Sequence, residues 1–236
     1  MKRISIAPTQ LNNDKIILTV EQQHYLYRVL RLDRFSRFIA MDGGGKSWLA
    51  ELTGNSEARI LETLVQDREL AVSLTLMVAL PKGNGFDYIV RCCTELGACC
   101  FVTVKSDRTL LQPSGNKFSR WRKIAAEAAE QSERQIVPVV REIVDFATAC
   151  QLSRESVTNC YLCVARNNAP HLLPALENRQ QGNILIATGP EGGWTQEEIE
   201  MAVSCGFQPV SLGKRILRAI TAPIFATSLV AATLES

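Results

Sequence analysis

The chain has 236 residues, of which 46% are hydrophobic, so it is long enough to bury a core and its composition argues against disorder. The formal net charge of +2 excludes a strongly basic protein of the kind that coats nucleic acid, but it allows a local basic patch. The sequence contains no apolar run of about eighteen residues and its N-terminus lacks a signal-peptide pattern, so we expect a cytoplasmic protein with no membrane contact.

The eight cysteines are typical of reduced, buried thiols, because their spacing matches no secreted disulfide framework. Cys160 and Cys163 form a CxxC pattern, but strand positions that are three residues apart point to opposite faces. The sequence has no second CxxC and no histidine pair, which a zinc site would need. We therefore expect no metal, and a metal or redox role is the less favoured alternative.

The first part of the chain, residues 1–69, alternates between short apolar segments and polar or glycine turns, at the spacing of a small β-barrel. One helix is expected to interrupt them, with Thr19 and Gln22 as a capping box at its start. Its expected apolar stripe comprises Tyr25, Leu26, Val29 and Leu30. Cations gather in the same region, at Lys2, Arg3, Arg28, Arg31, Arg34, Arg37 and Lys46. The cluster favours contacts with phosphates, and an ordinary solvated face is the alternative.

The composition changes near Leu70, where an almost continuous apolar run predicts a strand that is covered on both faces. We place a domain boundary just before it, which gives domains of residues 1–69 and 70–236. Strands and helices then alternate, with strands expected over 99–104, 160–165, 184–187 and 207–212 and helices over 86–96 and from 118 to about 135. The predicted fold class is α/β, with at least five mostly parallel strands and helices on both faces.

Two glycine-containing loops follow the strands expected at 184–187 and 207–212. The first loop contains Gly189, Pro190, Glu191, Gly192 and Gly193. A helix with a capping box of Thr195 and Glu198 follows it. The second loop begins at Gly213 and leads to the last helix, for which Thr221 is the expected N-cap. Open parallel sheets bind ligands at the carboxyl ends of their strands, so the two loops predict a binding site.

The residues of the two loops narrow the class of ligand that the site could bind. The first loop is neither a Walker A motif nor GxGxxG, and Glu191 would repel a phosphate at the helix N-terminus, so a neutral or cationic ligand fits better. The alternative is a simple turn. The second loop mixes cations with Ile216 and Leu217, which suits a pocket for an apolar ring beside an anionic substrate. One face of a predicted helix carries Glu127, Gln131 and Arg134. This face is either a functional surface or an ordinary solvated one.

Five segments, in a fixed order over nearly the whole chain, carry a resemblance to a known family. They are HYLYRVLRL at 24–32, TELGA at 94–98, RWRKIAAEAAEQSER at 120–134, GPEGGWTQEE at 189–198 and SLGKRILR at 211–218. The chain resembles the RsmE-type small-subunit ribosomal RNA methyltransferases, which are S-adenosylmethionine enzymes of the knotted SPOUT class. The resemblance implies an RNA-binding PUA-like barrel over 1–69, a methyltransferase domain with a C-terminal trefoil knot over 70–236, and a homodimer through the knotted domain.

The resemblance also implies roles for single residues. S-adenosylmethionine would be bound by Thr188, Gly189, Pro190, Glu191, Gly192, Gly193, Leu212, Gly213, Ile216 and Leu217. The family transfers the methyl group to N3 of a decoding-site uridine in 16S ribosomal RNA, and a cation such as Arg218 would stabilise the developing uridine anion. Contacts with the RNA are expected from Arg3, Arg28, Arg31, Lys82 and Arg134.

The chain departs from the family pattern at three places. Ile220 stands where a glutamate is usual, Cys92 or Cys93 where a lysine is common, and Phe35-Ser36 where a Gly-Asp turn is usual. The missing carboxylate leaves a second hypothesis open, an RNA-binding or ribosome-assembly protein that has lost catalysis. We favour a divergent branch with the same activity. A different nucleotide-dependent α/β enzyme is disfavoured because phosphate-binding motifs are absent from the sequence.

Overall fold

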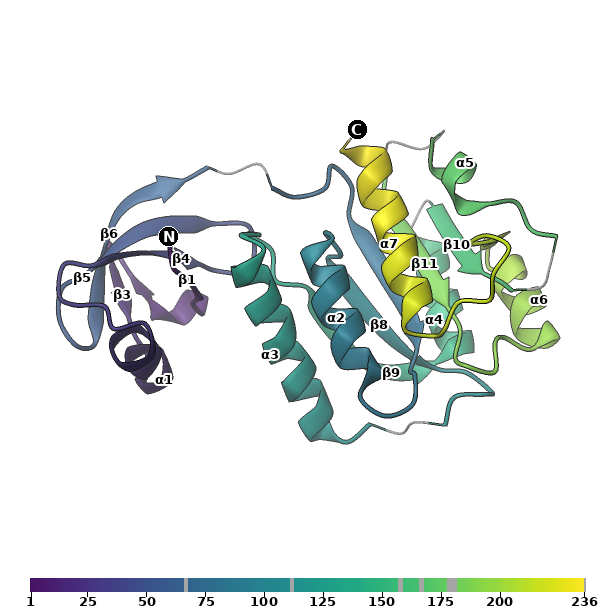
Figure 1. The fold of residues 1–236 in the computed structure, drawn as a ribbon, viewed down its shortest axis with the longest axis horizontal. Coiled ribbons are helices and arrows are strands. Elements are labelled where there is room, and N and C mark those ends of the chain that lie inside the picture. The colour runs from purple at the N-terminus through teal and green to yellow at the C-terminus, as the bar shows by residue number, and fades with distance from the viewer. Residues whose placement is uncertain (66–67, 111–112, 157–158, 166–167, 178–181, 236) are drawn as a thin grey trace. The chain divides into compact units, whose positions relative to one another are not determined.

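A computed structural model of the chain describes residues 1–65, 68–110, 113–156, 159–165, 168–177 and 182–235 (Figure 1). The chain forms two compact units, which are Met1–Glu69 with Ala129–Val137 and Leu70–Ala128 with Pro138–Ser236. The segment Ala129–Val137 thus joins the first unit, although it falls within the range expected for the second domain.

The first unit is built on a curled, mixed six-stranded sheet in the order β1-β4-β5-β6-β3-β2. Its strands are β1 (Arg3–Ser5), β2 (Leu11–Asn12), β3 (Lys15–Ile17), β4 (Arg37–Met41), β5 (Ser47–Leu52) and β6 (Glu57–Leu64). β1 pairs with β4 in parallel, and the remaining neighbours are antiparallel. The alternating apolar residues of these strands, among them Ile16, Phe38 and Leu52, fill one core.

The helix of the first unit begins where the sequence predicts. Thr19 and Gln22 form the reciprocal hydrogen bonds of a capping box at the start of α1 (Val20–His24). The expected apolar stripe is partly wrong, because α1 continues as a π-helical turn over Tyr25–Val29. Leu26 is fully buried, but Tyr25 and Val29 are 39% and 56% exposed. A π-helical turn has a different period from an α-helix, so a stripe laid out with α-helical spacing does not hold there. A short 3₁₀ turn, η1 (Pro8–Gln10), precedes β2.

The polar centre of the first unit is the carboxylate of Glu69. It accepts hydrogen bonds from the Arg134 guanidinium at 2.6 and 3.0 Å and from the backbone N–H groups of Gln135 and Ile136 at 2.9 and 3.0 Å. α3 (Gly115–Gln131) ends before this point. Arg134 therefore does not lie on one helical face with Glu127 and Gln131, as the periodicity suggested.

The second unit is a six-stranded sheet in the order β12-β10-β11-β7-β8-β9, and every neighbouring pair is parallel. Its strands are β7 (Leu74–Ala79), β8 (Cys100–Lys105), β9 (Val139–Asp145), β10 (Asn159–Cys163), β11 (Ile184–Thr188) and β12 (Gln208–Val210). This arrangement confirms the predicted α/β class with a parallel sheet. All five residues of β11 are buried, as a central strand covered on both faces requires.

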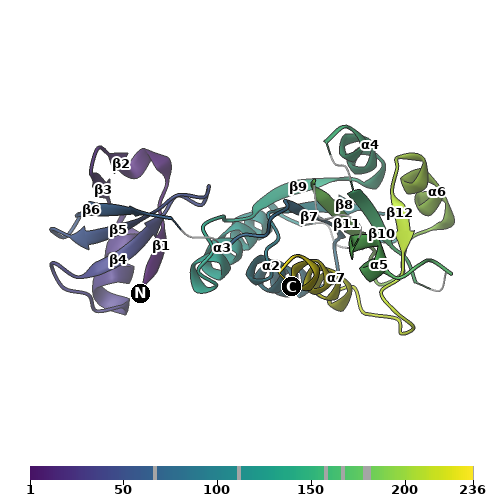
Figure 2. The same cartoon turned by 90° about the horizontal axis from the view of Figure 1, so that it is seen from above.

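Helices cover both faces of this sheet (Figure 2). α2 (Gly85–Glu95), α5 (Leu172–Glu177) and α7 (Thr221–Leu234) pack together on one side, and α4 (Phe146–Ser156) and α6 (Gln196–Ser204) pack on the other. The prediction that Thr221 caps α7 is wrong, because Ile220 is the N-cap residue. The N–H groups of Thr221 and Ala222 already donate to the carbonyl of Arg218, which places Thr221 inside the first turn.

Candidate functional site

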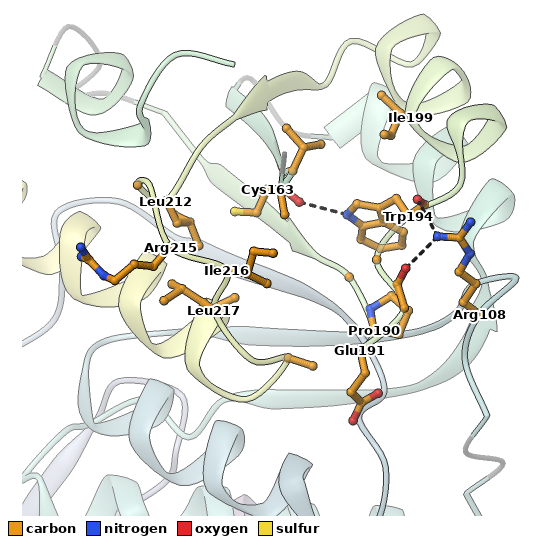
Figure 3. A pocket seen from close by; sticks show the side chains of 18 of the residues that line it. Arg108, Cys163, Pro190, Glu191, Trp194, Ile199, Leu212, Arg215, Ile216 and Leu217 are labelled. Carbon is orange, nitrogen blue, oxygen red and sulfur yellow. Dashed lines mark hydrogen bonds between the residues drawn. The ribbon is translucent and has the colours of Figure 1, made fainter. Parts of the chain in front are cut away.

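A cavity of about 560 Å³ opens beside the carboxyl ends of β10, β11 and β12 (Figure 3). It is lined by residues 163–165, 189–194 and 212–217, together with Arg108, Ile199, Ala219 and Ala222. Every residue predicted to bind the cofactor lies on this list except Thr188, which is buried within β11. The volume falls in the range of about 300–1,000 Å³ that is usual for small-molecule sites. The two glycine loops therefore share one cavity.

Trp194 fixes the end of the first loop. Its buried indole stacks on Phe146 with ring centroids 4.5 Å apart, and its Nε1 donates to the carbonyl of Cys163 at 3.2 Å. A Cβ atom on Gly189 would stand 3.2 Å from this indole, so glycine permits the close approach. Gly193 adopts φ +68°, a conformation that favours glycine.

The capping box predicted for α6 is present, and its glutamate also forms a hydrogen bond outside the helix. Glu198 accepts a hydrogen bond from the Thr195 N–H at 2.8 Å, and Thr195 Oγ1 accepts one from the Glu198 N–H at 3.2 Å. The second oxygen of the buried Glu198 carboxylate accepts from the backbone N–H of Asp107 at 3.0 Å. One carboxylate thus joins the start of α6 to the segment after β8.

Arg108 is a cavity residue that the sequence did not indicate. Its guanidinium donates to the carbonyl of Gly192 at 2.7 Å and to that of Trp194 at 3.5 Å (Figure 3). A Cβ atom on Gly192 would stand 3.0 Å from Arg108 Cδ. Arg108 therefore holds the first loop from the side, and its partners are backbone carbonyls, for which a sequence has no signature.

Glu191 ties the first loop to the segment between β7 and α2. Its carboxylate accepts a hydrogen bond from the backbone N–H of Lys82 at 2.9 Å. Because β7 and β11 are neighbouring parallel strands, this hydrogen bond joins the loops that follow their carboxyl ends. The side chain of Lys82, which was expected to contact RNA, is exposed.

The second loop supplies the apolar wall. Gly213 adopts φ +110°, and the side chains of Ile216 and Leu217 lie side by side below Cys163 in the view of Figure 3, whereas Arg215 points away. Ile216 is 62% exposed although it lines the cavity. An exposed large aliphatic side chain at the mouth of a cavity is suited to packing against an apolar ligand surface.

The end of the second loop holds Arg218, the cation that was expected to act on the RNA, and Ile220, which was expected to replace a glutamate. Arg218 is exposed, lies between cavity-lining Leu217 and Ala219, and makes no side-chain hydrogen bond or ion pair within the described part of the chain. Ile220 packs on α2, since a Cβ atom on Gly85 would stand 2.7 Å from Ile220 Cδ1. The position of the usual glutamate is therefore an apolar contact here.

The predicted RNA-binding arginines divide into two groups. Arg3 and Arg134 are buried and paired with Glu133 at 3.1 Å and with Glu69, so their guanidinium groups are already engaged within the first unit, and a contact with RNA stays a prediction. Arg28 and Arg31 are exposed, and neither forms an ion pair among the residues that the structure describes. These two arginines remain available to a polyanion.

Several thiols stay protonated in the folded protein. Burial raises the pKa of Cys163, which lines the cavity, to about 12, and it raises the pKa of Cys93 and Cys150 to about 12 as well. The unfolded chain releases these protons near pH 8.5, whereas the folded chain retains them up to about pH 12. Their contribution to stability is therefore fully present below pH 8.5 and is lost as the pH rises toward 12.

We expect the free energy of unfolding, measured with urea, to fall between about pH 8.5 and pH 10.5, by at most about 1.4 kcal/mol per pH unit for each such thiol. Cys150→Ala should lower the stability at neutral pH and make the dependence on pH shallower. An unchanged slope in Cys150→Ala would show that this thiol does not carry the effect.

Within the described residues, no group of three or more His, Cys, Asp and Glu side chains could hold a metal ion. Over the same residues, none of the helices has the length and apolar character needed to cross a membrane.

Comparisons with known proteins agree with each other. Residues 68–231 match a family model described as an RNA methyltransferase domain. The ribosomal RNA small subunit methyltransferase E of Synechocystis sp. is 48% identical, over 99% of this chain and 78% of that protein. Its namesake from Bacillus subtilis is 30% identical, over 97% of this chain and 92% of that protein.

A crystal structure of the ribosomal RNA small subunit methyltransferase E from Neisseria gonorrhoeae, bound to S-adenosyl methionine, matches the whole fold. Its TM-score is 0.86 and its sequence identity 31%, over 97% of this chain and 95% of that one. The chain therefore belongs to the RNA methyltransferase family and, within it, to the ribosomal RNA small subunit methyltransferases E.

Proposed function

We propose that the protein is an S-adenosylmethionine-dependent enzyme that methylates N3 of a decoding-site uridine in 16S ribosomal RNA. The observation that carries the proposal is that the loops after β11 and β12 share a cavity. Membership of the family and the cofactor bound by the relative from Neisseria gonorrhoeae support the choice of cofactor.

The cavity fits S-adenosylmethionine in chemistry as well as in size. The cofactor would be held by backbone groups of Gly189–Gly193 and Leu212–Gly213, with Ile216 and Leu217 packed against its apolar parts. The Glu191 carboxylate, which would disfavour a phosphate, is compatible with a ligand that carries a sulfonium cation. When bound, this cofactor supplies a methyl group attached to positively charged sulfur, which is open to attack by a nucleophile.

Arg218 is the residue we assign to the chemistry on the RNA. The uridine N3 must lose its proton before it can accept a methyl group, and negative charge then develops on the base. A guanidinium that is exposed beside the cavity and is held by no carboxylate in the described part of the chain can stabilise that charge. The target base would have to be splayed out of its stack to reach the site.

Arg218→Ala should lower kcat for RNA methylation by about 100-fold, because one stabilising donor in a transition state is lost, and should leave cofactor affinity unchanged. Initial rates with labelled cofactor and calorimetric titration measure the two quantities. Arg141→Ala, which removes an exposed arginine from β9 at the other edge of the sheet, is the matched control and should keep the parent rate. A parent rate in Arg218→Ala would remove this residue from the mechanism.

We further propose that the protein is a homodimer of SPOUT type, with a trefoil knot near the C-terminus and a PUA-like first unit. α7 supports the dimer, because its sequence is apolar on every side and Phe225 is 37% exposed on it. Tyr88, on the neighbouring α2, is 60% exposed. Apolar side chains on two packed helices are suited to a partner surface.

The competing function is an RNA-binding or assembly protein without catalysis, which Ile220 in place of the usual glutamate would favour. Incubation of the protein and S-adenosylmethionine with small ribosomal subunits from cells that lack the endogenous enzyme separates the two. Mass-spectrometric mapping should find one new N3-methyluridine in 16S ribosomal RNA. Tight, salt-dependent binding of the subunits without any methylation would support the competing function instead.

A further inference from the structure

The turn that precedes β4 presents an aromatic ring to solvent. Phe35 is 63% exposed and adopts φ +72°, a left-handed conformation that is strained for a bulky side chain. Because the ring is exposed, Phe35 adds little buried apolar surface to the hydrophobic core. Strained residues that the surrounding structure holds in place gather at functional sites, so this turn is a candidate for one.

Backbone hydrogen bonds fix the turn against β5. The N–H of Phe35 donates to the carbonyl of Leu52 at 2.8 Å, and the N–H of Leu52 donates to the carbonyl of Ser36 at 3.0 Å. The Ser36 N–H donates to the carbonyl of Asp33 at 3.0 Å, and Ser36 Oγ accepts from the Asp33 N–H at 3.0 Å. The exposure of the ring is therefore set by an anchored backbone.

One cation lies over the ring, and two more belong to the same segment of the chain. The guanidinium carbon of Arg34 lies 4.9 Å from the centroid of Phe35, within the range of a cation–π contact. Arg28 and Arg31 are exposed in the same segment, and Asp33 is its one acidic residue. Among the residues that the structure describes, none of these three arginines forms an ion pair. The segment from Arg28 to Phe35 thus has a charge of +2, from three arginines and one aspartate.

An exposed aromatic ring beside one arginine, in a basic segment, matches the way proteins hold unpaired nucleic-acid bases, which stack on the ring while cations contact the phosphates. We propose that Arg34 and Phe35 form a stacking platform for an unpaired base of the RNA substrate, and that Arg28 and Arg31 contact nearby phosphates. The proposal rests on the proposed function only for the nature of the substrate. Its new content is the stacking of a base on Arg34 and Phe35, beyond the phosphate contacts already expected of Arg28 and Arg31.

The test compares Phe35→Gly with the parent in binding a fluorescent single-stranded oligoribonucleotide, measured by anisotropy at fixed salt. Glycine suits φ +72°, so the variant should melt at the parent temperature or above it, which separates loss of the ring from loss of the fold. We expect the affinity to fall about 5- to 150-fold, the effect of removing one base–aromatic stack. Phe35→Trp should retain the affinity and show tryptophan quenching on binding.

Controls identify the stacked base. A blunt RNA duplex, and an oligonucleotide with abasic sites along its length, should bind the parent and Phe35→Gly equally, because neither offers a free base. Val20→Ala removes another exposed apolar side chain of the same unit and should leave the affinity unchanged. Equal affinity of the parent and a folded Phe35→Gly for the single strand would overturn the proposal.

Two further outcomes separate this proposal from the proposed function. Loss of affinity in Phe35→Gly supports the platform even when the parent fails to methylate ribosomal RNA. Unchanged oligonucleotide affinity with weakened binding of intact small subunits would assign the ring to a ribosomal protein and so overturn the platform.

Discussion

Replacement of Glu69 by alanine should lower the free energy of unfolding by about 3–5 kcal/mol, which is the cost of leaving one partner of a buried ion pair uncompensated. The side chain of Arg134 is 3% exposed, and the Glu69 carboxylate also accepts the N–H groups of Gln135 and Ile136. Because these donors close the segment Ala129–Val137 onto the first unit, we expect a less cooperative transition as well. Urea unfolding followed by circular dichroism and tryptophan fluorescence measures both effects.

Matched variants separate charge from packing at this site. Glu69→Gln keeps the shape and one acceptor and should cost less than Glu69→Ala. Arg134→Met in the Glu69→Ala background removes the stranded cation and should recover part of the loss. If Glu69→Ala had the same midpoint of urea unfolding as the parent, the hydrogen bonds of the Glu69 carboxylate would make no contribution to stability.

Trp194→Ala should lower the free energy of unfolding of the second unit by a similar amount, about 3–5 kcal/mol, because it removes a large buried side chain. The variant loses the stack on Phe146 and leaves the carbonyl of Cys163 without its indole partner. Trp194 also fills the space against Gly189, so the first loop should relax and the affinity for S-adenosylmethionine should fall. Thermal unfolding and calorimetric titration of the cofactor report the two losses separately.

Trp194→Phe keeps an aromatic ring and removes the N–H donor, so it should cost only about 1–3 kcal/mol, the penalty of one unsatisfied buried acceptor. Its cofactor affinity should lie between that of the parent and that of Trp194→Ala. Parent affinity in a folded Trp194→Ala would contradict the role of the indole in shaping the first loop.

Local patterns predicted the parts of the fold that depend on neighbours in sequence. Both capping boxes, Thr19 with Gln22 and Thr195 with Glu198, have the predicted hydrogen bonds, because each joins residues three apart. The apolar runs of β7, β10 and β11 are strands for the same reason, since a buried parallel strand needs continuous apolar side chains. The positions of the two glycine loops followed directly from these strands.

Contacts between distant residues could not be predicted in this way. Arg108 reaches the carbonyl of Gly192 across 84 positions, and Arg134 reaches Glu69 across 65. A periodic pattern placed Arg134 on one helical face with Glu127 and Gln131, either functional or solvated, but the helix ends at Gln131. The helices α4 and α5 were missed as well, and their sequences carry no capping box of the kind that marks α6.

Departures from the family pattern acquire physical meaning in the structure. Glycine is usual where Phe35 stands, and the backbone there has φ +72°, which glycine adopts without strain. Ile220, at the position of the usual glutamate, packs on Gly85 at the start of α2. The first departure adds an aromatic ring to a basic segment, and the second exchanges a charge for an apolar contact between the second loop and α2.

Calorimetric titration of the purified protein with S-adenosylmethionine tests most directly whether the loops after β11 and β12 form one cofactor site. Saturable binding of one cofactor per chain is predicted, and ATP should not compete, because the loop that contains Glu191 has no phosphate-binding motif. Absence of saturable binding, or displacement of S-adenosylmethionine by ATP, would contradict the proposed cofactor site.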